Sequence, residues 1–305
     1  MSQRILSIDS QILNSIQACA RKTNYQFVRN LNPPVKAEAL ERGSLIHDML
    51  EIYYSLKGNC IKENAPWIGK LTSAGLVDPM SAHPTDHASI VKLCIEAGNY
   101  FSTQINLDAN ICAATIKTFR DYTEYYEHDS WHALAVEEVG SKILHEDDEL
   151  KIVYNFKVDL VAEKGTIIAP WDHKSGARNE EPTSLSNQFI GYCYGLNVTN
   201  IVINKIGFQK TLSAKERFPR YILSIDPVRI EEWRQNAIYW CRLLIHSLDV
   251  DQWPMNLTHC DKYSGCIYER ICTTTPESRE RTINIDYVVG EKWDVASMLE
   301  SKKEG

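Results

Sequence analysis

The stretch FKVDLVAEKGTIIAPWDHK, residues 156–174, contains two runs of strand-forming residues with a turn between them. Val, Ile and Trp side chains favour strands, and the turn at 163–165 is short enough to make the two strands neighbours. Residues two apart on a strand share a face, so Asp172 and Lys174 point into the same space. The turn also brings Asp159 towards Asp172. We therefore expect two carboxylates and an ammonium group together on one sheet.

Such a group is costly to bury unless it holds a cation. Hard oxygen ligands suit Mg²⁺ or Mn²⁺. A metal of this kind polarises a phosphoryl oxygen and activates a water, and a neighbouring lysine stabilises the charge that develops. The pattern therefore points to hydrolysis of phosphodiesters. Taken alone it is weak, because Asp172 and Lys174 could equally be a surface ion pair and Asp159 a polar residue at a strand end.

The rest of the chain alternates between helical and strand-forming segments. Apolar spacing and turn residues predict helices at 10–27, 37–57, 87–105, 110–127, 184–196 and 228–246, and strands at 131–144, 149–162, 166–173, 200–209 and 220–225. Helices come first, then a strand-rich centre with an inserted helix, then helices again. This order indicates an α/β or α+β fold.

The composition limits the class of protein. The formal net charge of −7 excludes a basic nucleic-acid binder of the usual kind. Nine cysteines, an odd number, together with an N-terminus too polar for a signal peptide, indicate reduced thiols or metal ligands. No apolar run is long enough to cross a membrane. We expect an intracellular, cytoplasmic protein that does not bind membranes.

Four sequence motifs together resemble the PD-(D/E)XK nuclease superfamily, and within it the RecB-like branch. The segments VDLV and IIAPWDHKSG carry Asp159, Asp172 and Lys174, and RGSLIHDMLE carries His47. Downstream, the helix at 184–196 carries a Q-x-x-x-Y pattern, formed by Gln188 and Tyr192. The resemblance covers most of residues 15–275.

The resemblance implies a restriction-endonuclease-like fold, in which helices flank a central mixed sheet. It implies a Mg²⁺- or Mn²⁺-dependent deoxyribonuclease, an exonuclease on single strands or DNA ends. His47, Asp159 and Asp172 would bind the metal, and Asp159, Asp172, Lys174, Gln188 and Tyr192 would form the catalytic set. Glu137 or Glu138 occupies a position that is often acidic in relatives, and strand alternation does not decide which of them faces the site.

Three of the cysteines, Cys260, Cys266 and Cys272, are separated by five residues each, and Cys19 lies far upstream. The arrangement resembles RecB-like nucleases that hold a [4Fe–4S] cluster with one cysteine before the core and three after it. Relatives usually place only two residues between the second and third cysteines. Zn²⁺ is the alternative, with His259 as a substitute ligand, and four buried thiols without metal are another. A redox sensor is a further hypothesis.

These expectations divide the chain into three regions. Residues 1–130 form a mainly helical region that supplies His47 and Cys19. Residues 131–250 form the nuclease core, and residues 251–305 form the cysteine-cluster segment and a tail.

DNA is the expected partner. Basic and aromatic residues that could follow a phosphate backbone or stack on bases flank the centre: Arg21, Lys22, Tyr25, Arg29, Lys205, Lys210, Lys215, Arg217 and Arg220. Among them, the loop at 210–220 is the best candidate for a DNA-facing segment. No P-loop motif occurs, so a helicase or recombinase partner would be a separate chain. The resemblance extends to CRISPR-adaptation and phage recombination nucleases, so a phage-encoded protein is compatible with it. The competing function is a non-catalytic DNA-binding or assembly subunit that retains the nuclease fold.

Overall fold

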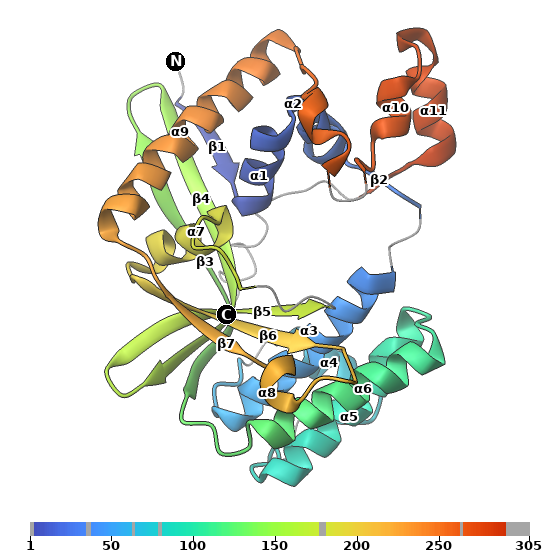
Figure 1. Ribbon diagram of the computed structural model, residues 1–305, viewed down its shortest axis with the longest axis vertical. Coiled ribbons are helices and arrows are strands. Elements are labelled where there is room, and N and C mark those ends of the chain that lie inside the picture. The colour runs from blue at the N-terminus through green and yellow to red at the C-terminus, as the bar shows by residue number, and fades with distance from the viewer. Residues whose placement is uncertain are drawn as a thin grey trace.

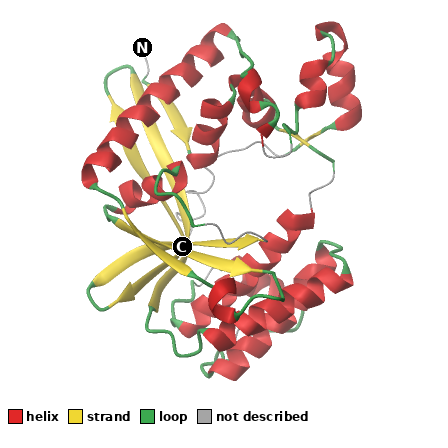
Figure 2. Cartoon of the chain, viewed as in Figure 1, coloured by secondary structure: helices red, strands yellow, loops and turns green. Residues whose placement is uncertain are grey.

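The computed structural model describes residues 3–34, 38–62, 65–78, 81–176, 181–262 and 265–290. It confirms an α/β fold in which helices flank a central mixed sheet (Figure 1, Figure 2). Within these ranges, no helix is long and apolar enough to cross a lipid bilayer.

The central sheet contains six strands: β1 (Arg4–Ile8), β3 (His132–Glu146), β4 (Leu150–Lys164), β5 (Ile167–Gly176), β6 (Asn200–Gly207) and β7 (Arg220–Ser224). The turn after β4 forms the expected antiparallel hairpin with β5, and Gly165 adopts a positive φ of 61° there. Strand β6 runs parallel to β5, and β7 antiparallel to β6. All five predicted strands are therefore confirmed, with small shifts at their ends.

Strand β4 changes partner along one of its edges. Residues 150–154 pair in parallel with β1, whereas residues 160–164 pair antiparallel with β5. Strand β3 runs antiparallel along the opposite edge. Among the described residues, no strand pairs with residues 155–159 on the first edge. The sheet therefore forks at this point of β4.

Helices cover both faces of the sheet (Figure 1). On one side lie α3 (Glu38–Lys57), α4 (Pro66–Ser73), α5 (His87–Gln104), α6 (Ala109–Tyr125) and the short α8 (Ala214–Arg217). On the other side lie α1 (Ser10–Ala18), α7 (Asn187–Leu196) and α9 (Pro227–Val250). The side chains of β6 alternate between two hydrophobic cores, one on each face of the sheet. Val202 and Ile206 belong to the first core, and Ile201 and Ile203 belong to the second.

Helix α7 approaches β4 closely because Gly191 has no side chain. A Cβ atom at this position would lie 2.0 Å from the hydroxyl oxygen of Tyr154, a distance that no real contact allows. Ser186 caps the start of the helix by accepting a hydrogen bond from the backbone N–H of Phe189, and Asn197 ends it in the left-handed conformation. These local signals fix where α7 begins and ends.

Two parts of the N-terminal region differ from the sequence-based expectation. Residues 4–8, which were not expected to be a strand, form β1 and join the central sheet. The helix expected at 10–27 is interrupted at Cys19, whose backbone is extended (φ −169°, ψ 119°). It continues as α2 (Ala20–Thr23) and a π-helical turn, η1 (Asn24–Val28).

A third, small core joins residues 25–32 to the last described elements of the chain. Strand β2 (Leu31–Asn32) pairs with β8 (Val288–Val289), beside η2 (Leu257–His259), α10 (Glu269–Thr273), η4 (Pro276–Ser278) and α11 (Arg279–Asp286). The buried side chains of this core are Tyr25, Leu31, Tyr268, Ile271 and Ile283. We call these elements, together with α2 and η1, the terminal subdomain.

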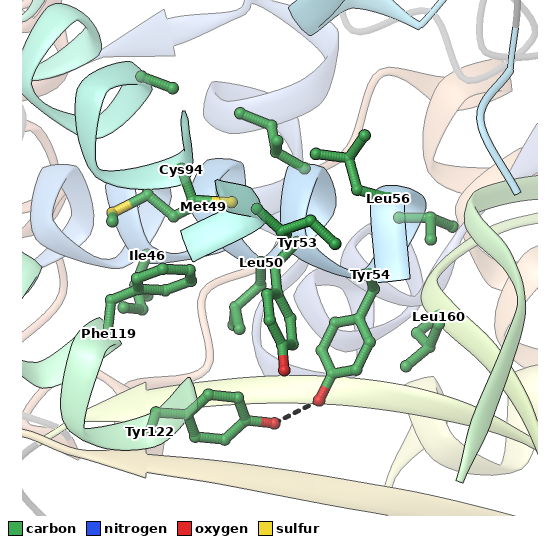
Figure 3. Packing of buried hydrophobic residues seen from close by; sticks show 14 of the residues in the cluster. Ile46, Met49, Leu50, Tyr53, Tyr54, Leu56, Cys94, Phe119, Tyr122 and Leu160 are labelled. Carbon is green, nitrogen blue, oxygen red and sulfur yellow. Dashed lines mark hydrogen bonds between the residues drawn. The ribbon is translucent and has the colours of Figure 1, made fainter. Parts of the chain in front are cut away.

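Beneath the sheet, the first core holds a buried polar network. Figure 3 shows its centre, where the Tyr54 and Tyr122 hydroxyl oxygens lie 2.5 Å apart among apolar side chains of α3, α5 and α6. Arg220 donates to both hydroxyls and forms an ion pair of 2.5 Å with Asp129. Both charged side chains are at most one-tenth exposed. A buried pair of this kind is costly to break, because the remaining charge has no partner.

We predict that Arg220→Met lowers the free energy of unfolding by about 3–5 kcal/mol, because it leaves the buried Asp129 carboxylate without the arginine that pairs with it. Urea denaturation followed by circular dichroism measures this change. The matched control is Arg120→Met on the exposed face of α6, which should change stability by no more than about 0.5 kcal/mol. Equal stability of Arg220→Met and the unaltered protein would contradict the structural role of the pair.

Candidate active site

A cleft of about 700 Å³ opens where the sheet forks. Helix α3 forms one wall, the N-terminal end of α1 and the side chains of α7 form another, and β4 and β5 form the floor. Of the residues predicted from sequence, His47, Asp159, Lys174, Gln188 and Tyr192 line this cleft, and Asp172 lies directly beside Lys174. The structure therefore brings all six together.

Asp159 occupies the point where β4 separates from its neighbour. Its carboxylate oxygen Oδ2 accepts a hydrogen bond of 2.7 Å from the backbone N–H of His173 on β5. The same oxygen lies 3.7 Å from Nδ1 of His47 on α3. Burial raises the pKa of Asp159 to about 7, while the His173 N–H opposes this shift and the nearby Glu137 adds to it.

Asp172 and Lys174 lie on β5 with their charges in contact. Nζ of Lys174 is 2.8 Å from Oδ2 of Asp172. The Asp172 side chain is almost completely buried, whereas Lys174 is partly exposed towards the cleft. Burial raises the pKa of Asp172 to about 6, although the Lys174 charge lowers it.

His173, between these two residues, points to the opposite face of β5. Its ring stacks on Tyr54 with centroids 5.5 Å apart, and its Nδ1 lies 2.9 Å from Nδ2 of Asn204. Asn204 also donates to the Tyr122 hydroxyl, so His173 belongs to the buried network that contains Arg220. The network thus holds β5 from below while Asp172 and Lys174 face the cleft.

Two consecutive hydrogen bonds link Lys174 to side chains of helix α7. Nζ of Lys174 donates to Oε1 of Gln188 at 2.9 Å, and Nε2 of Gln188 donates to the Tyr192 hydroxyl at 2.8 Å. Burial raises the pKa of Tyr192 well above its usual value, and so the hydroxyl keeps its proton. The four-residue spacing of Gln188 and Tyr192 places both on the same helix face, as the sequence indicated.

Of the two neighbouring glutamates, Glu137 faces the cleft and Glu138 does not line it. Glu137 lines the cleft and forms an ion pair with Lys157 of β4, whereas Glu138 forms one of 3.2 Å with Lys62. The backbone of Glu137 is in the left-handed region, with φ of 51°, which is unfavourable for a residue with a Cβ. The strand is therefore distorted where Glu137 enters the cleft.

Two further carboxylates of α3 line the cleft, Asp48 and Glu51. Burial and then the charge of Glu137 raise the pKa of Glu51 to about 7. Sequence reasoning missed both residues. The available signal was the i, i+4 spacing of His47 and Glu51, which places them on one face of α3.

Among the described residues, no group of three His, Cys, Asp or Glu side chains is close enough to form a ready-made metal site. The chemistry of the donors nevertheless fits a hard divalent cation. Asp159 and Asp172 are buried carboxylates, and their raised pKa values reflect the cost of burying negative charge. Burial also lowers the pKa of His47, which favours the neutral imidazole that binds metals.

Cys19, Cys260, Cys266 and Cys272 line one small pocket in the terminal subdomain, together with Tyr25, Tyr268 and His259. Burial raises the pKa of Cys272, and the nearby Cys266, Cys19 and Cys260 add to this shift. The extended backbone at Cys19 interrupts the helix beside this pocket. The thiols predicted from spacing therefore converge, although the pocket is not a formed coordination site.

Two predicted DNA contacts are wrong. Arg217 forms an ion pair of 2.7 Å with Asp121 and is buried, and Arg220 is paired with Asp129 beneath the sheet. Both arginines therefore stabilise the fold. Of the remaining basic residues in the loop at 210–220, Lys210 and Lys215 are exposed.

Comparison with known proteins identifies the family. No curated protein matches the sequence. A solved structure titled "Crystal structure of SSO0001" is 13% identical, with a TM-score of 0.32, over 70% of this chain and 97% of that chain. The sequence profile of the PD-(D/E)XK nuclease superfamily matches residues 10–273, which include every residue placed in the cleft except Asp9. The chain therefore belongs to the PD-(D/E)XK nuclease superfamily.

Proposed function

We propose that this protein is a Mg²⁺- or Mn²⁺-dependent deoxyribonuclease of the RecB-like branch that acts as an exonuclease on single strands or DNA ends. The observation that carries the proposal is the position of Lys174, held between the Asp172 carboxylate and the Gln188 amide at the edge of an acidic cleft. Family membership supports cleavage of nucleic acid.

In the proposed mechanism His47, Asp159 and Asp172 hold the metal. When bound, the ion polarises the phosphoryl oxygens and lowers the pKa of a water molecule. Lys174 orients the attacking water and stabilises the negative charge that develops at phosphorus. Hydrolysis forms a bond from phosphorus to the water oxygen and breaks the bond to the sugar oxygen that leaves. Gln188, oriented by Tyr192, fixes the direction of the ammonium group.

A non-catalytic DNA-binding or assembly subunit is the second candidate, and the net charge of −7 favours it. The ion pair of Asp172 with Lys174, beside Asp159 in the same cleft, supports catalysis instead. The two candidates differ in one measurable respect, which is cleavage that depends on a divalent metal.

We predict that Lys174→Ala lowers kcat about 100- to 1000-fold, because charge developing in the transition state loses the stabilising ammonium group. The assay measures release of acid-soluble nucleotides from DNA in Mg²⁺ or Mn²⁺. Chelation with EDTA should abolish activity, and either metal should restore it. The matched control is Lys164→Ala, at the exposed turn of the same hairpin, which should keep full activity. Full activity of Lys174→Ala, or cleavage in EDTA, would rule the proposal out.

The two neighbouring glutamates offer a paired test of the cleft. We predict that Glu137→Gln lowers kcat/KM at least about 10-fold, because Glu137 lines the cleft and its charge acts on the pKa of Asp159. Glu138→Gln, which removes the charge paired with Lys62, should retain the activity of the unaltered enzyme. Steady-state kinetics on one DNA substrate measures both variants. A larger loss for Glu138→Gln would contradict the geometric assignment.

We further propose that Cys19, Cys260, Cys266 and Cys272 bind a [4Fe–4S] cluster, with Zn²⁺ as the alternative. The support is that four thiols from distant parts of the sequence line one pocket, and that thiolates suit both metals. All nine cysteines have free thiols, which fits an intracellular, reducing location. A helicase or recombinase, if one takes part, is proposed to be a separate chain.

We predict that anaerobically purified protein is brown, absorbs near about 400 nm and contains iron and sulfide. Cys266→Ser should lose the colour and the metal, whereas Cys60→Ser should keep both because Cys60 lies outside the pocket. Absorbance and metal analysis measure the result. Colourless protein with bound zinc would refute the cluster and support the alternative.

A further inference from the structure

We infer that a second groove, formed by α1, α7 and α9, holds the unpaired strand of the substrate as it passes the catalytic cleft. The groove has a volume of about 860 Å³. The residues that matter for the argument are Asn14 and Gln17 of α1, Asn187 of α7, and Arg229, Asn236 and Trp240 of α9. This inference rests on the proposed nuclease function.

The groove adjoins the cleft, because Asn14 lines both cavities. Helix α7 also takes part in both, because Asn187 lies in the groove and the adjacent Gln188 contacts Lys174 in the cleft. Figure 1 shows α1, α7 and α9 on the same side of the sheet, beside the strand that carries Asp159. A strand that leaves the cleft past α1 therefore enters the groove.

The floor of the groove is a fixed set of amides. Nδ2 of Asn187 donates to Oδ1 of Asn14 and to Oε1 of Gln17, both at 2.7 Å. Oδ1 of Asn187 accepts from the indole N–H of Trp233 at 2.9 Å. Because these contacts use the oxygen atoms of Asn14 and Gln17, they present the NH₂ groups of both side chains as donors. Amide donors of this kind suit the edges of nucleobases.

The walls favour unpaired bases over a duplex. Trp240 is half-buried in the groove and offers a flat indole on which a base can stack. Arg229, on the same helix, is exposed and is accompanied by Glu232, so the groove has no stripe of cations. Stacking on an indole and hydrogen bonding at a base edge both require a base that has left the duplex. Trp240 and the amide donors therefore match single-stranded DNA.

The test compares Trp240→Ala with Leu248→Ala, an exposed apolar residue further along α9 that does not line the groove. For Trp240→Ala, KM on long single-stranded oligothymidylate should rise roughly 5- to 100-fold, the range expected for loss of one stacked base. The kcat, and the KM for the shortest cleavable oligonucleotide, should stay unchanged. Leu248→Ala should match the unaltered protein, and Trp240→Phe should recover most of the affinity because it keeps an aromatic face.

Fluorescence anisotropy of labelled oligothymidylate provides a second measurement that does not require cleavage, and thermal melting shows that each variant is folded. Weaker binding by Trp240→Ala, restored by Trp240→Phe, supports the groove. Unchanged KM and unchanged binding for Trp240→Ala overturn it, as does an equal rise of KM on short and long substrates. If the unaltered protein cleaves no oligonucleotide, the proposed function fails, and anisotropy still decides whether the groove binds single strands.

Discussion

One hydrogen bond, from the backbone N–H of His173 to the carboxylate of Asp159, joins two strands at the point where their ladder stops. A side chain takes the place of a backbone carbonyl there, because no strand in the described part of the chain pairs with residues 155–159 on that edge of β4. The same carboxylate must therefore complete the sheet and face the cleft. This dual role fixes the separation of β4 and β5, and with it the position of Asp172 and Lys174 relative to Asp159.

Successive side chains of β5 face two different environments. Asp172 and Lys174 face the cleft, while His173 is held from the other side by Tyr54 and Asn204. The aromatic and cationic network around Arg220 is rigid because its members are buried and mutually hydrogen-bonded. The carboxylates of the cleft repel one another, and this network stabilises the strand that carries Asp172 from the opposite face.

Local features of the fold could be predicted from the sequence. The turn at 163–165 and the alternation of β5 are set by neighbouring residues, so Asp159, Asp172 and Lys174 came together as expected. The histidine on α3 and the Gln188–Tyr192 pair on α7 were found only through resemblance to a family.

Features that depend on distant partners could not be predicted. The short strand β1 exists because residues 150–154 of β4 offer it a partner. Glu137 faces the cleft because its backbone has a positive φ, and the alternation of side chains along a regular strand does not predict this conformation. Arg217 and Arg220 looked like DNA contacts in sequence, but Asp121 and Asp129, on or just after α6, pair with them in the fold.

The terminal subdomain has a consequence for the order in which the chain is made. Residues 19–34 are synthesised more than 230 residues before their partners, as the contacts Tyr268–Leu31 and Arg29–Glu280 show. Closing loops of this length is entropically costly until the intervening sheet has folded and brought these segments together. The pocket of four cysteines therefore completes after translation of the core, and a nascent chain holds a folded sheet before that pocket exists.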